Sequence, residues 1–329
     1  MKKKQVLIAT AVALTSCMAA AQTSVSIYGV ADMGIVRQDN GGPAGAVWRL
    51  DSGMHSGSRI GFRGVEDLGG GLSALFVLEN GHNLDAGTAA QGGLLFGRQA
   101  WVGLGSAVGT VKFGRQITPI HNALGVIDPM ATGLAGDISR IINSYGVRMN
   151  NTVNYTLPKL AGISGELAYG LGEVAGDSSA SRQIGLALNY TNGPVVAQFA
   201  FHEAENPTGT DSARTTLLGG VYNFTVARLH AAYAVNRGLG TLDTRDAMIG
   251  ASVPFGAHSF MVSYIHKEDK ARADADADQI NLAYTYALSK RTNLYTSYSR
   301  TSNDSVVSYL AARPGATDKV INAGIRHRF

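Results

Sequence analysis

Catalytic and metal-binding chemistry depends on His, Cys, Ser, Asp or Glu side chains at characteristic spacings, and this chain offers few such groupings. Its eight histidines are scattered, and none has the spacing of a metal-binding pair with another. The Gly-x-Ser-x-Gly motif of serine hydrolases is absent. The single cysteine, Cys17, excludes a disulfide scaffold and a Cys-based zinc site. We therefore expect neither a cofactor nor a resident metal, and no enzymatic activity.

The densest acidic run is Asp274, Asp276 and Asp278, which resembles the start of a calcium-binding loop. Such a loop needs Gly at its sixth position and Glu at its twelfth, but this chain has Gln279 and Thr285 there. A solvated loop is the favoured interpretation, and loose divalent-cation binding is the alternative.

Arginine is the remaining residue type with useful chemistry. Arg59 and Arg63 alternate with the apolar Ile60 and Phe62. A guanidinium group stays charged and presents a planar fork of donors to carboxylate or phosphate oxygens. What such groups can do depends on the face of the element that carries them.

Those elements are predicted to be β-strands. After residue 21 the apolar runs are short, whereas a membrane-spanning helix needs roughly 20 apolar residues. Alternation is abundant instead: Ile280, Leu282, Tyr284 and Tyr286 alternate with small or polar residues. A period of two indicates strands with one apolar and one polar face.

Two architectures fit this alternation, a soluble β-sandwich and a transmembrane β-barrel. The second face is rich in Gly, Ser, Thr, Asn and Arg, and the chain has 41 glycines with only 16% charged residues. A barrel turns its apolar face to lipid and keeps the polar face for a wet lumen, and glycine suits its curved wall. Tyrosines of the strands, Tyr28 among them, suit the aromatic girdles of such a barrel.

Connection lengths favour the barrel. Long and short connections alternate, as they do in outer-membrane barrels with an even number of strands. The prediction is an all-β, 16-stranded antiparallel transmembrane barrel, too wide for its side chains to fill. The expected strands are residues 24–37, 56–65, 72–81, 94–105, 109–115, 149–157, 163–173, 182–191, 195–204, 214–223, 227–236, 246–254, 258–268, 278–288, 292–301 and 318–329.

The N-terminus is expected to be an export signal. Three lysines precede an apolar run and the small residues Ala19, Ala20 and Ala21, which indicates a signal peptide over residues 1–21 and a barrel over residues 22–329. The alternatives are a lipoprotein cleavage box ending at Cys17 and a buried N-terminal helix. Removing three lysines and no acid lowers the formal net charge from +4 to +1. Export and near-neutrality argue against a nucleic-acid partner.

The longest connection is residues 116–148. A loop of this length is usually functional or disordered. It carries apolar residues, including Ile120, Leu124 and Ile127, which favour packing inside the lumen, where the loop would narrow the channel. An ordinary external flap is the alternative. Its only carboxylates are Asp128 and Asp137, so the narrowed region is expected to be positively charged.

Several motifs resemble the general porins of β-proteobacteria, including the neisserial type. They are residues 57–72 (GSRIGFRGVEDLGGGL), residues 25–32 (VSIYGVAD), residues 109–115 (GTVKFGR) and residues 324–329 (GIRHRF). The resemblance implies a homotrimer in the outer membrane, in contact with lipid and lipopolysaccharide. It also implies passive diffusion of ions and small hydrophilic solutes, with the third external loop folded inward. The C-terminal Phe329 matches the aromatic residue that the barrel-assembly machinery reads.

The resemblance also implies a basic cluster opposite the loop, as in similar anion-preferring porins. The matching positions are Arg59, Arg98 and Arg148, with Glu79 at an acidic wall position. We hypothesise that these arginines, together with Arg63 and Arg115, set a modest anion preference. The alternative is that they pair with Glu79 and Asp128 and only brace the loop.

Strand parity supports part of this cluster. Arg59 and Arg63 lie opposite the apolar face, so they are expected in the lumen, because arginine in lipid costs roughly 2–4 kcal/mol near the bilayer midplane. Arg98 shares the parity of Ala100 and Val102, which are expected to face lipid. A bulge near Gly97 or a position above the bilayer would reconcile this. Alternative functions are a substrate-specific porin for dicarboxylates or oligosaccharides, an adhesin and an outer-membrane barrel enzyme.

Overall fold

The computed structural model describes residues 24–142 and 146–329. The expected signal peptide (residues 1–21), with Cys17, lies outside the described residues.

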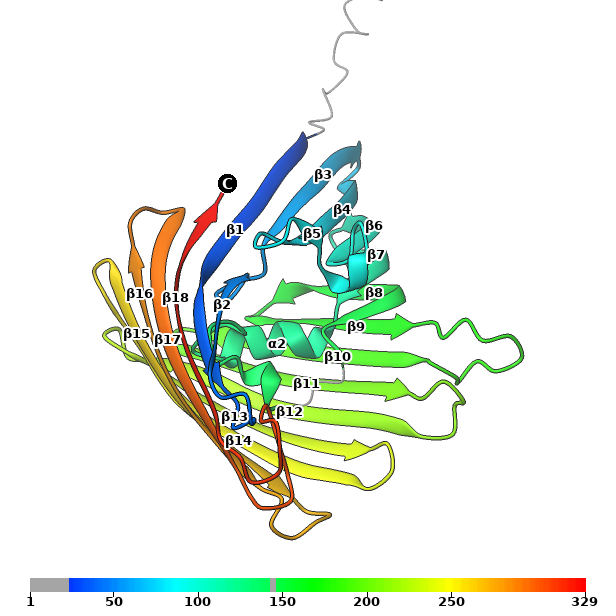
Figure 1. Ribbon diagram of the computed structural model, residues 1–329. Helices are drawn as coiled ribbons and strands as arrows, with labels where there is room; N and C mark the ends of the chain where they lie inside the picture. Colours follow the sequence, from blue (N-terminus) through cyan, green and yellow to red (C-terminus); the bar gives the residue numbers. More distant parts are fainter. Residues whose placement is uncertain (1–23, 143–145) are drawn as a thin grey trace, which may run out of the picture.

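The described residues form one closed antiparallel barrel (Figure 1). Sixteen strands make its wall, and the pairing of β1 with β18 closes the ring. Two further segments, β2 (Val47–Ser52) and β5 (Thr88–Ala89), pair with β1 and β4. The wall strands are β1 (Ser24–Asp39), β3 (Arg59–Gly69), β4 (Leu72–Asn83), β6 (Gln99–Ser106), β7 (Gly109–Ile117), β8 (Arg148–Leu160), β9 (Ile163–Gly170), β10 (Gln183–Asn192), β11 (Val195–Glu205), β12 (Ser212–Asn223), β13 (Arg228–Gly238), β14 (Leu242–Phe255), β15 (His258–Asp269), β16 (Ala277–Ala287), β17 (Thr292–Asn303) and β18 (Asp318–Arg328). The predicted fold class is confirmed, and each of the sixteen predicted strands overlaps one wall strand. The bounds differ most for the strand predicted over residues 94–105, because β6 begins only at Gln99.

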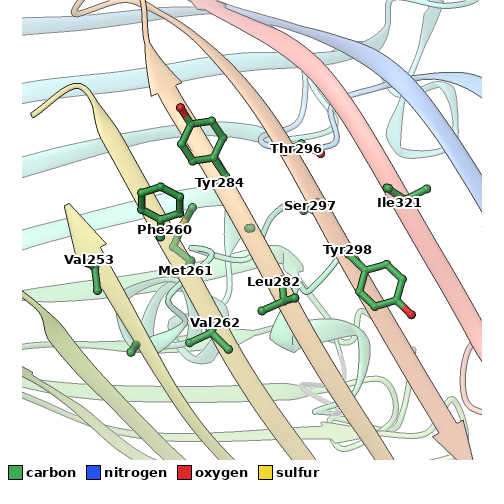
Figure 2. A pocket seen from close by; sticks show the side chains of 12 residues that line it. Val253, Phe260, Met261, Val262, Leu282, Tyr284, Thr296, Ser297, Tyr298 and Ile321 are labelled. Carbon is green, nitrogen blue, oxygen red and sulfur yellow. The ribbon is translucent and has the colours of Figure 1, made fainter. Parts of the chain in front are cut away.

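The alternation in the sequence becomes the two faces of this wall. Figure 2 shows the outward face over β14 to β18, where Phe260, Val262, Leu282, Tyr298 and Ile321 lie side by side. The intervening residues of β16 point inward and are fully buried, as Gln279 and Asn281 show. The apolar side chains therefore face outward, which is the arrangement expected of a barrel in lipid.

The strands are joined by tight turns at the end of the barrel that carries both described chain ends. Phe255 pairs with His258 across a two-residue turn, and Gly256 there has a φ of +58°. Glycine reaches this left-handed conformation without steric cost, which suits a two-residue hairpin.

The connection between β7 and β8 lies against the inner face of the wall (Figure 1). It contains a helix, α2 (Pro119–Ile127), and a 3₁₀ turn, η2 (Ile138–Arg140). The Thr118 hydroxyl caps the helix by accepting the N–H of His121. The helix was not predicted, because its apolar residues were interpreted only as loop packing.

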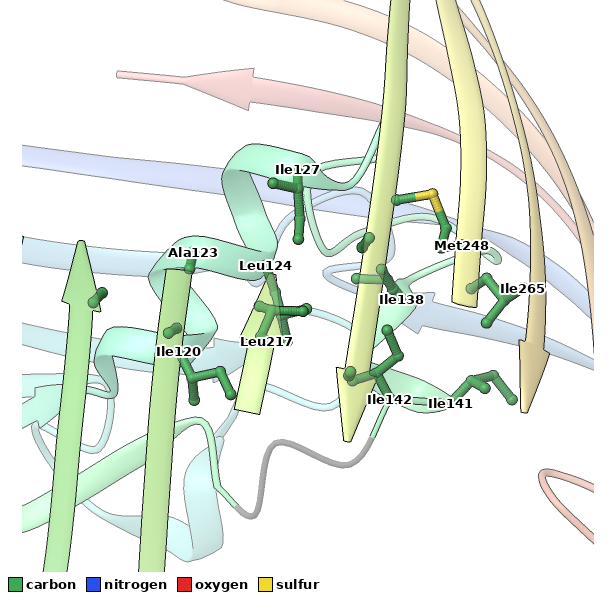
Figure 3. Close-up of a cluster of buried hydrophobic side chains, with 14 residues drawn as sticks. Ile120, Ala123, Leu124, Ile127, Ile138, Ile141, Ile142, Leu217, Met248 and Ile265 are labelled. Carbon is green, nitrogen blue, oxygen red and sulfur yellow. The ribbon is translucent and has the colours of Figure 1, made fainter. Parts of the chain in front are cut away.

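The buried face of α2 forms the core of the molecule. Ile120, Leu124 and Ile127 follow helical spacing and are fully buried against wall residues such as Leu217 and Ile265 (Figure 3). Two wall glycines make room for this contact. A Cβ on Gly219 would lie 2.7 Å from Ile127 Cδ1, and one on Gly250 would lie 2.8 Å from Pro129 Cγ. Part of the glycine surplus therefore serves loop docking as well as wall curvature.

Among the described residues, no helix is long and apolar enough to span a membrane.

Candidate pore constriction

The site begins where the wall is interrupted between β2 and β3. β1 pairs with β3 along one half of its length and with β2 along the other. Between these pairings, residues 53–58 are held by Asp32 of β1: the N–H of Gly53 donates to its carbonyl oxygen at 2.8 Å, and the N–H groups of His55 and Ser56 donate to its carboxylate at 2.9 and 2.6 Å. We call residues 53–58 the wall segment. It carries the chain to Arg59, the first residue of β3.

Glu79 on β4 is the centre of an ion-pair cluster. Its carboxylate accepts the Nε–H of Arg98 at 2.7 Å and the hydroxyl of Tyr28 at 2.8 Å. Arg59 Nε lies 3.9 Å from the same carboxylate. The Glu79 side chain is 5% exposed, whereas those of Arg98 and Arg59 are 12% and 24% exposed. The carboxylate is therefore buried beneath its arginines, and part of the guanidinium surface stays open to the lumen.

Strand parity predicted that Arg98 faces lipid, like Ala100 and Val102, but the structure places Arg98 outside the strand. It precedes β6, which begins at Gln99, and its backbone N–H donates to the carbonyl oxygen of Glu79 at 3.1 Å. Strand alternation therefore does not apply to Arg98, and its side chain reaches the lumenal Glu79. Tyr28, expected in an aromatic girdle, also contacts Glu79 rather than the outer surface.

A cavity of about 580 Å³ adjoins the cluster. Its lining includes Arg59 and Arg98 together with Arg326 and Arg328 of β18. Among its lining residues, Glu79 carries the only side-chain carboxylate. His55 also lines it. The cavity therefore carries an excess of fixed positive charge.

The other predicted arginines lie at different distances from this cluster. Arg148 donates its Nε–H to the carbonyl oxygen of Arg98 at 3.0 Å, which places it beside the cluster. Arg63 lies over the Tyr28 ring, with Cζ 5.4 Å from the ring centroid. Arg115 donates to the carbonyl oxygen of Gly97 and to the side chain of Asn150. None of these three arginines lines the cavity.

The two loop carboxylates organise the loop itself. Asp128 caps the end of α2 and is 3% exposed; its carboxylate accepts the backbone N–H groups of Met130, Thr132 and Ile138 at 3.0, 2.9 and 3.3 Å. Burial raises the Asp128 pKa to about 7. No ion pair joins Asp128 to an arginine among the described residues, so arginine pairing is present at Glu79 but not at Asp128.

Asp137 caps η2 by accepting the N–H of Ser139 at 2.8 Å. It lines a second cavity, of about 280 Å³, between the loop and β1, together with Arg49, Asp51 and Arg140. This cavity contains both signs of charge and shares only Ser56 with the lining of the arginine cavity.

Two cavity arginines were not identified as site residues from the sequence. Arg326 and Arg328 occupy the polar face of the last strand, so alternation places them in the lumen. Their proximity to Arg59 arises only through barrel closure, in which Val30 pairs with both Arg59 and Arg328.

Among the described residues, no group of three His, Cys, Asp or Glu side chains could hold a metal ion. The acidic run at Asp274, Asp276 and Asp278 begins in the β15–β16 connection, where Asp276 accepts the backbone N–H of Asp269.

Comparison with known proteins adds an independent finding. The family described as Gram-negative porin matches residues 9–305. The chain is 32% identical to an outer membrane porin protein of Bordetella pertussis, over 99% of this chain and all of that protein. It is 31% identical to outer membrane porin protein 32 of Delftia acidovorans, with the same coverage.

Solved structures agree with the fold. An anion-selective porin from Comamonas acidovorans is 28% identical, with a TM-score of 0.85 over 94% of this chain and all of that one. OmpF of Salmonella typhi, in complex with daunomycin, is 18% identical with a TM-score of 0.73, a likeness that concerns the fold alone.

Proposed function

This chain belongs to the Gram-negative porin family, and we propose that it passes small hydrophilic solutes through an arginine-lined constriction that favours anions. As a general porin of the outer membrane, it provides passive diffusion through a water-filled barrel. The family and the relatives indicate a channel rather than an enzyme. The proposal includes the absence of hydrolytic activity, which a hydrolase assay on the purified protein tests.

The observation that carries the anion preference is the charge of the cavity lining. Four guanidinium groups, those of Arg59, Arg98, Arg326 and Arg328, line it, and Glu79 supplies the single side-chain carboxylate. Glu79 is closest to Arg98, at 2.7 Å, so it neutralises that arginine most. The remaining guanidinium charge raises the local concentration of anions and lowers that of cations.

The constriction is expected to filter rather than to trap. A guanidinium offers donors to carboxylate, phosphate and simple anions alike, so it favours a charge class over one solute. Passage requires that each contact be weak enough to release the ion. Water in the cavity screens the arginines, and their exposure is partial, so the contacts remain in this weak range.

The loop between β7 and β8 is proposed as the element that confines the ions. The apolar contacts of α2 occupy the lumen against β10 to β13. Ala131, which follows α2, lines the arginine cavity. The loop thus fills one side of the bore with apolar packing and leaves the arginine side for solutes.

The test is the zero-current potential of the purified protein in a planar bilayer under a KCl gradient. An anion preference gives a zero-current potential with the sign of the chloride equilibrium potential. This potential should become smaller at higher salt, because salt screens the arginines. A preference for potassium would contradict the proposal. Saturable block by one solute would indicate a substrate-specific porin instead.

Assembly is proposed to follow the family pattern, with a homotrimer in contact with lipid and lipopolysaccharide. The C-terminal Phe329 is proposed as the signal for the assembly machinery. Its backbone N–H and carbonyl pair with those of Gly29 at 3.1 and 3.0 Å, which extends the closing pairing to the last residue. Cross-linking of whole cells tests the trimer, and the yield of folded Phe329→Ala protein tests the signal.

A further inference from the structure

Asp32 occupies a special place on the inner face of the barrel. It lies on β1 and is fully buried. One carboxylate oxygen accepts the hydroxyl of Tyr295 on β17 at 2.5 Å, and the other accepts the N–H groups of His55 and Ser56. Both carboxylate oxygens are therefore engaged, one by the wall and one by the wall segment.

The backbone of Asp32 holds the two ends of the same segment. Its carbonyl oxygen accepts the N–H of Gly53 at 2.8 Å and the hydroxyl of Ser58 at 3.0 Å. Its N–H donates to the Ser58 hydroxyl oxygen at 3.1 Å. The wall segment is thus fastened to one residue at its start, its middle and its end.

The far side of the wall segment contacts the connection between β7 and β8 at Gly133 and Leu134, which we call the loop tip. The N–H of Leu134 donates to the carbonyl oxygen of Met54 at 2.6 Å. A Cβ on Gly133 would lie 2.2 Å from the carbonyl oxygen of His55, which shows how closely the two backbones approach. The Met54 side chain packs with Leu134 in a small apolar cluster. The loop tip therefore rests on the wall segment.

The same segment also borders the arginine cavity. Its His55 and Ser56 line the cavity, and Arg326 Nη1 donates to the Ser56 hydroxyl oxygen at 3.3 Å. Arg59 directly follows the segment. Any displacement of the segment would move the loop tip on one side and two cavity arginines on the other.

We propose that Asp32 is the positioning residue of the constriction. By fastening the wall segment to β1 and β17, it fixes the distance between the loop tip and the arginines, and so sets the width and the charge of the passage. Its effect on ion preference depends on the arginine filter proposed above, whereas its effect on channel width does not.

The experiment compares Asp32→Ala with Asp32→Asn in single-channel recordings. The alanine removes every side-chain acceptor, so we expect the conductance to change by about twofold or more, with raised open-channel noise and a weaker ion preference. The asparagine oxygen can still accept from the wall segment, while its amide can donate to the Tyr295 oxygen. Asp32→Asn is therefore expected to retain the wild-type conductance and noise.

A matched control separates positioning from stability. Asp246 on β14 is also a fully buried carboxylate, paired with Lys267 at 2.7 Å and remote in the register from the wall segment. Asp246→Ala is expected to lower the thermal unfolding temperature, as Asp32→Ala does, and to leave conductance and noise unchanged. Equal changes in conductance from both variants would reduce Asp32 to a stabilising residue and overturn the proposal.

A milder variant covers the case in which Asp32→Ala yields no folded barrel. Tyr295→Phe removes one donor to the carboxylate and leaves the carboxylate in place. Tyr295→Phe is expected to raise open-channel noise, by less than Asp32→Ala does. Wild-type conductance, noise and ion preference in a folded Asp32→Ala, or in Tyr295→Phe if only that variant folds, would overturn the proposal. A wild-type channel without anion preference would refute the filter and leave the conductance test of Asp32 intact.

Discussion

Replacing Glu79 by glutamine is the sharpest test of how the constriction is charged. The carboxylate lies 2.7 Å from Arg98 and 3.9 Å from Arg59, and it is almost completely buried. Glutamine has nearly the same size and can still accept the hydroxyl of Tyr28. Glu79→Gln therefore removes a negative charge and leaves the arginines in place. Anion preference should rise, although a residue at the centre of the site has been neutralised.

The size of the rise follows from Coulomb's law. An ion that passes about 5 Å from the unmasked Arg98 guanidinium in a water-like dielectric experiences a change of about 0.8 kcal/mol, or roughly fourfold in local concentration. The change has opposite signs for anions and cations, so the anion-to-cation permeability ratio should rise by up to about sixteenfold at low salt. In 1 M salt the screening length is only about 3 Å, and the rise should shrink to roughly twofold or less.

The assay is the zero-current potential in planar bilayers at low and high salt, for the wild type and Glu79→Gln. The control is Glu203→Gln. Glu203 also forms an ion pair with an arginine, Arg214 at 2.8 Å, but it does not line the arginine cavity. The control should leave the potential unchanged. A Glu79→Gln channel with unchanged or lower anion preference, or with a rise that salt does not reduce, would show that Arg98 does not act on passing ions.

Three further predictions address the arginines and the loop. Arg59→Gln should lower the anion preference several-fold at low salt, as measured by the zero-current potential in planar bilayers. Arg63→Gln is the control: it makes the same change on the same strand but outside the cavity, and it should lower the anion preference far less. Burial raises the Asp128 pKa to about 7, well above that of an exposed aspartate. As the pH rises from about 4 to 7, an exposed Asp128 in the undocked loop ionises more readily than the buried one, so the free energy that holds the loop in place decreases. The loop should therefore be held more tightly at pH 5 than at pH 8, and hydrogen exchange of residues 118–142, corrected for intrinsic rates, should show more protection at pH 5; greater protection at pH 8 would contradict this. Leu124→Ala should destabilise the loop packing by about 2–5 kcal/mol, because Leu124 is fully buried. It should lower the thermal unfolding temperature and raise channel noise, while Val126→Ala, at a position 46% exposed, should change neither measurably.

The wall could be predicted from the sequence because its signal is local. A strand exposes its two faces within a few residues. The alternation of Ile60 and Phe62 with Arg59 and Arg63 therefore indicates a strand, and the arginines mark its lumenal face, because arginine is unfavourable in lipid. The loop was less readable. Ile120, Leu124 and Ile127 follow helical spacing, but a single helix of nine residues is marginal by itself and is stabilised by packing on the wall.

The sequence by itself determined the class of the protein, the strand order and the charge types that face the lumen, because side-chain alternation and connection length are properties of neighbouring residues. Only the tertiary structure decided which of those charges meet. Arg59 and Arg328 are far apart in the sequence and share one cavity because β1 pairs with both β3 and β18. Asp128, expected near the arginines, turned inward to satisfy backbone N–H groups of its own loop. These outcomes depend on ring closure and on which wall and loop atoms come into contact, and neither can be deduced from neighbouring residues alone.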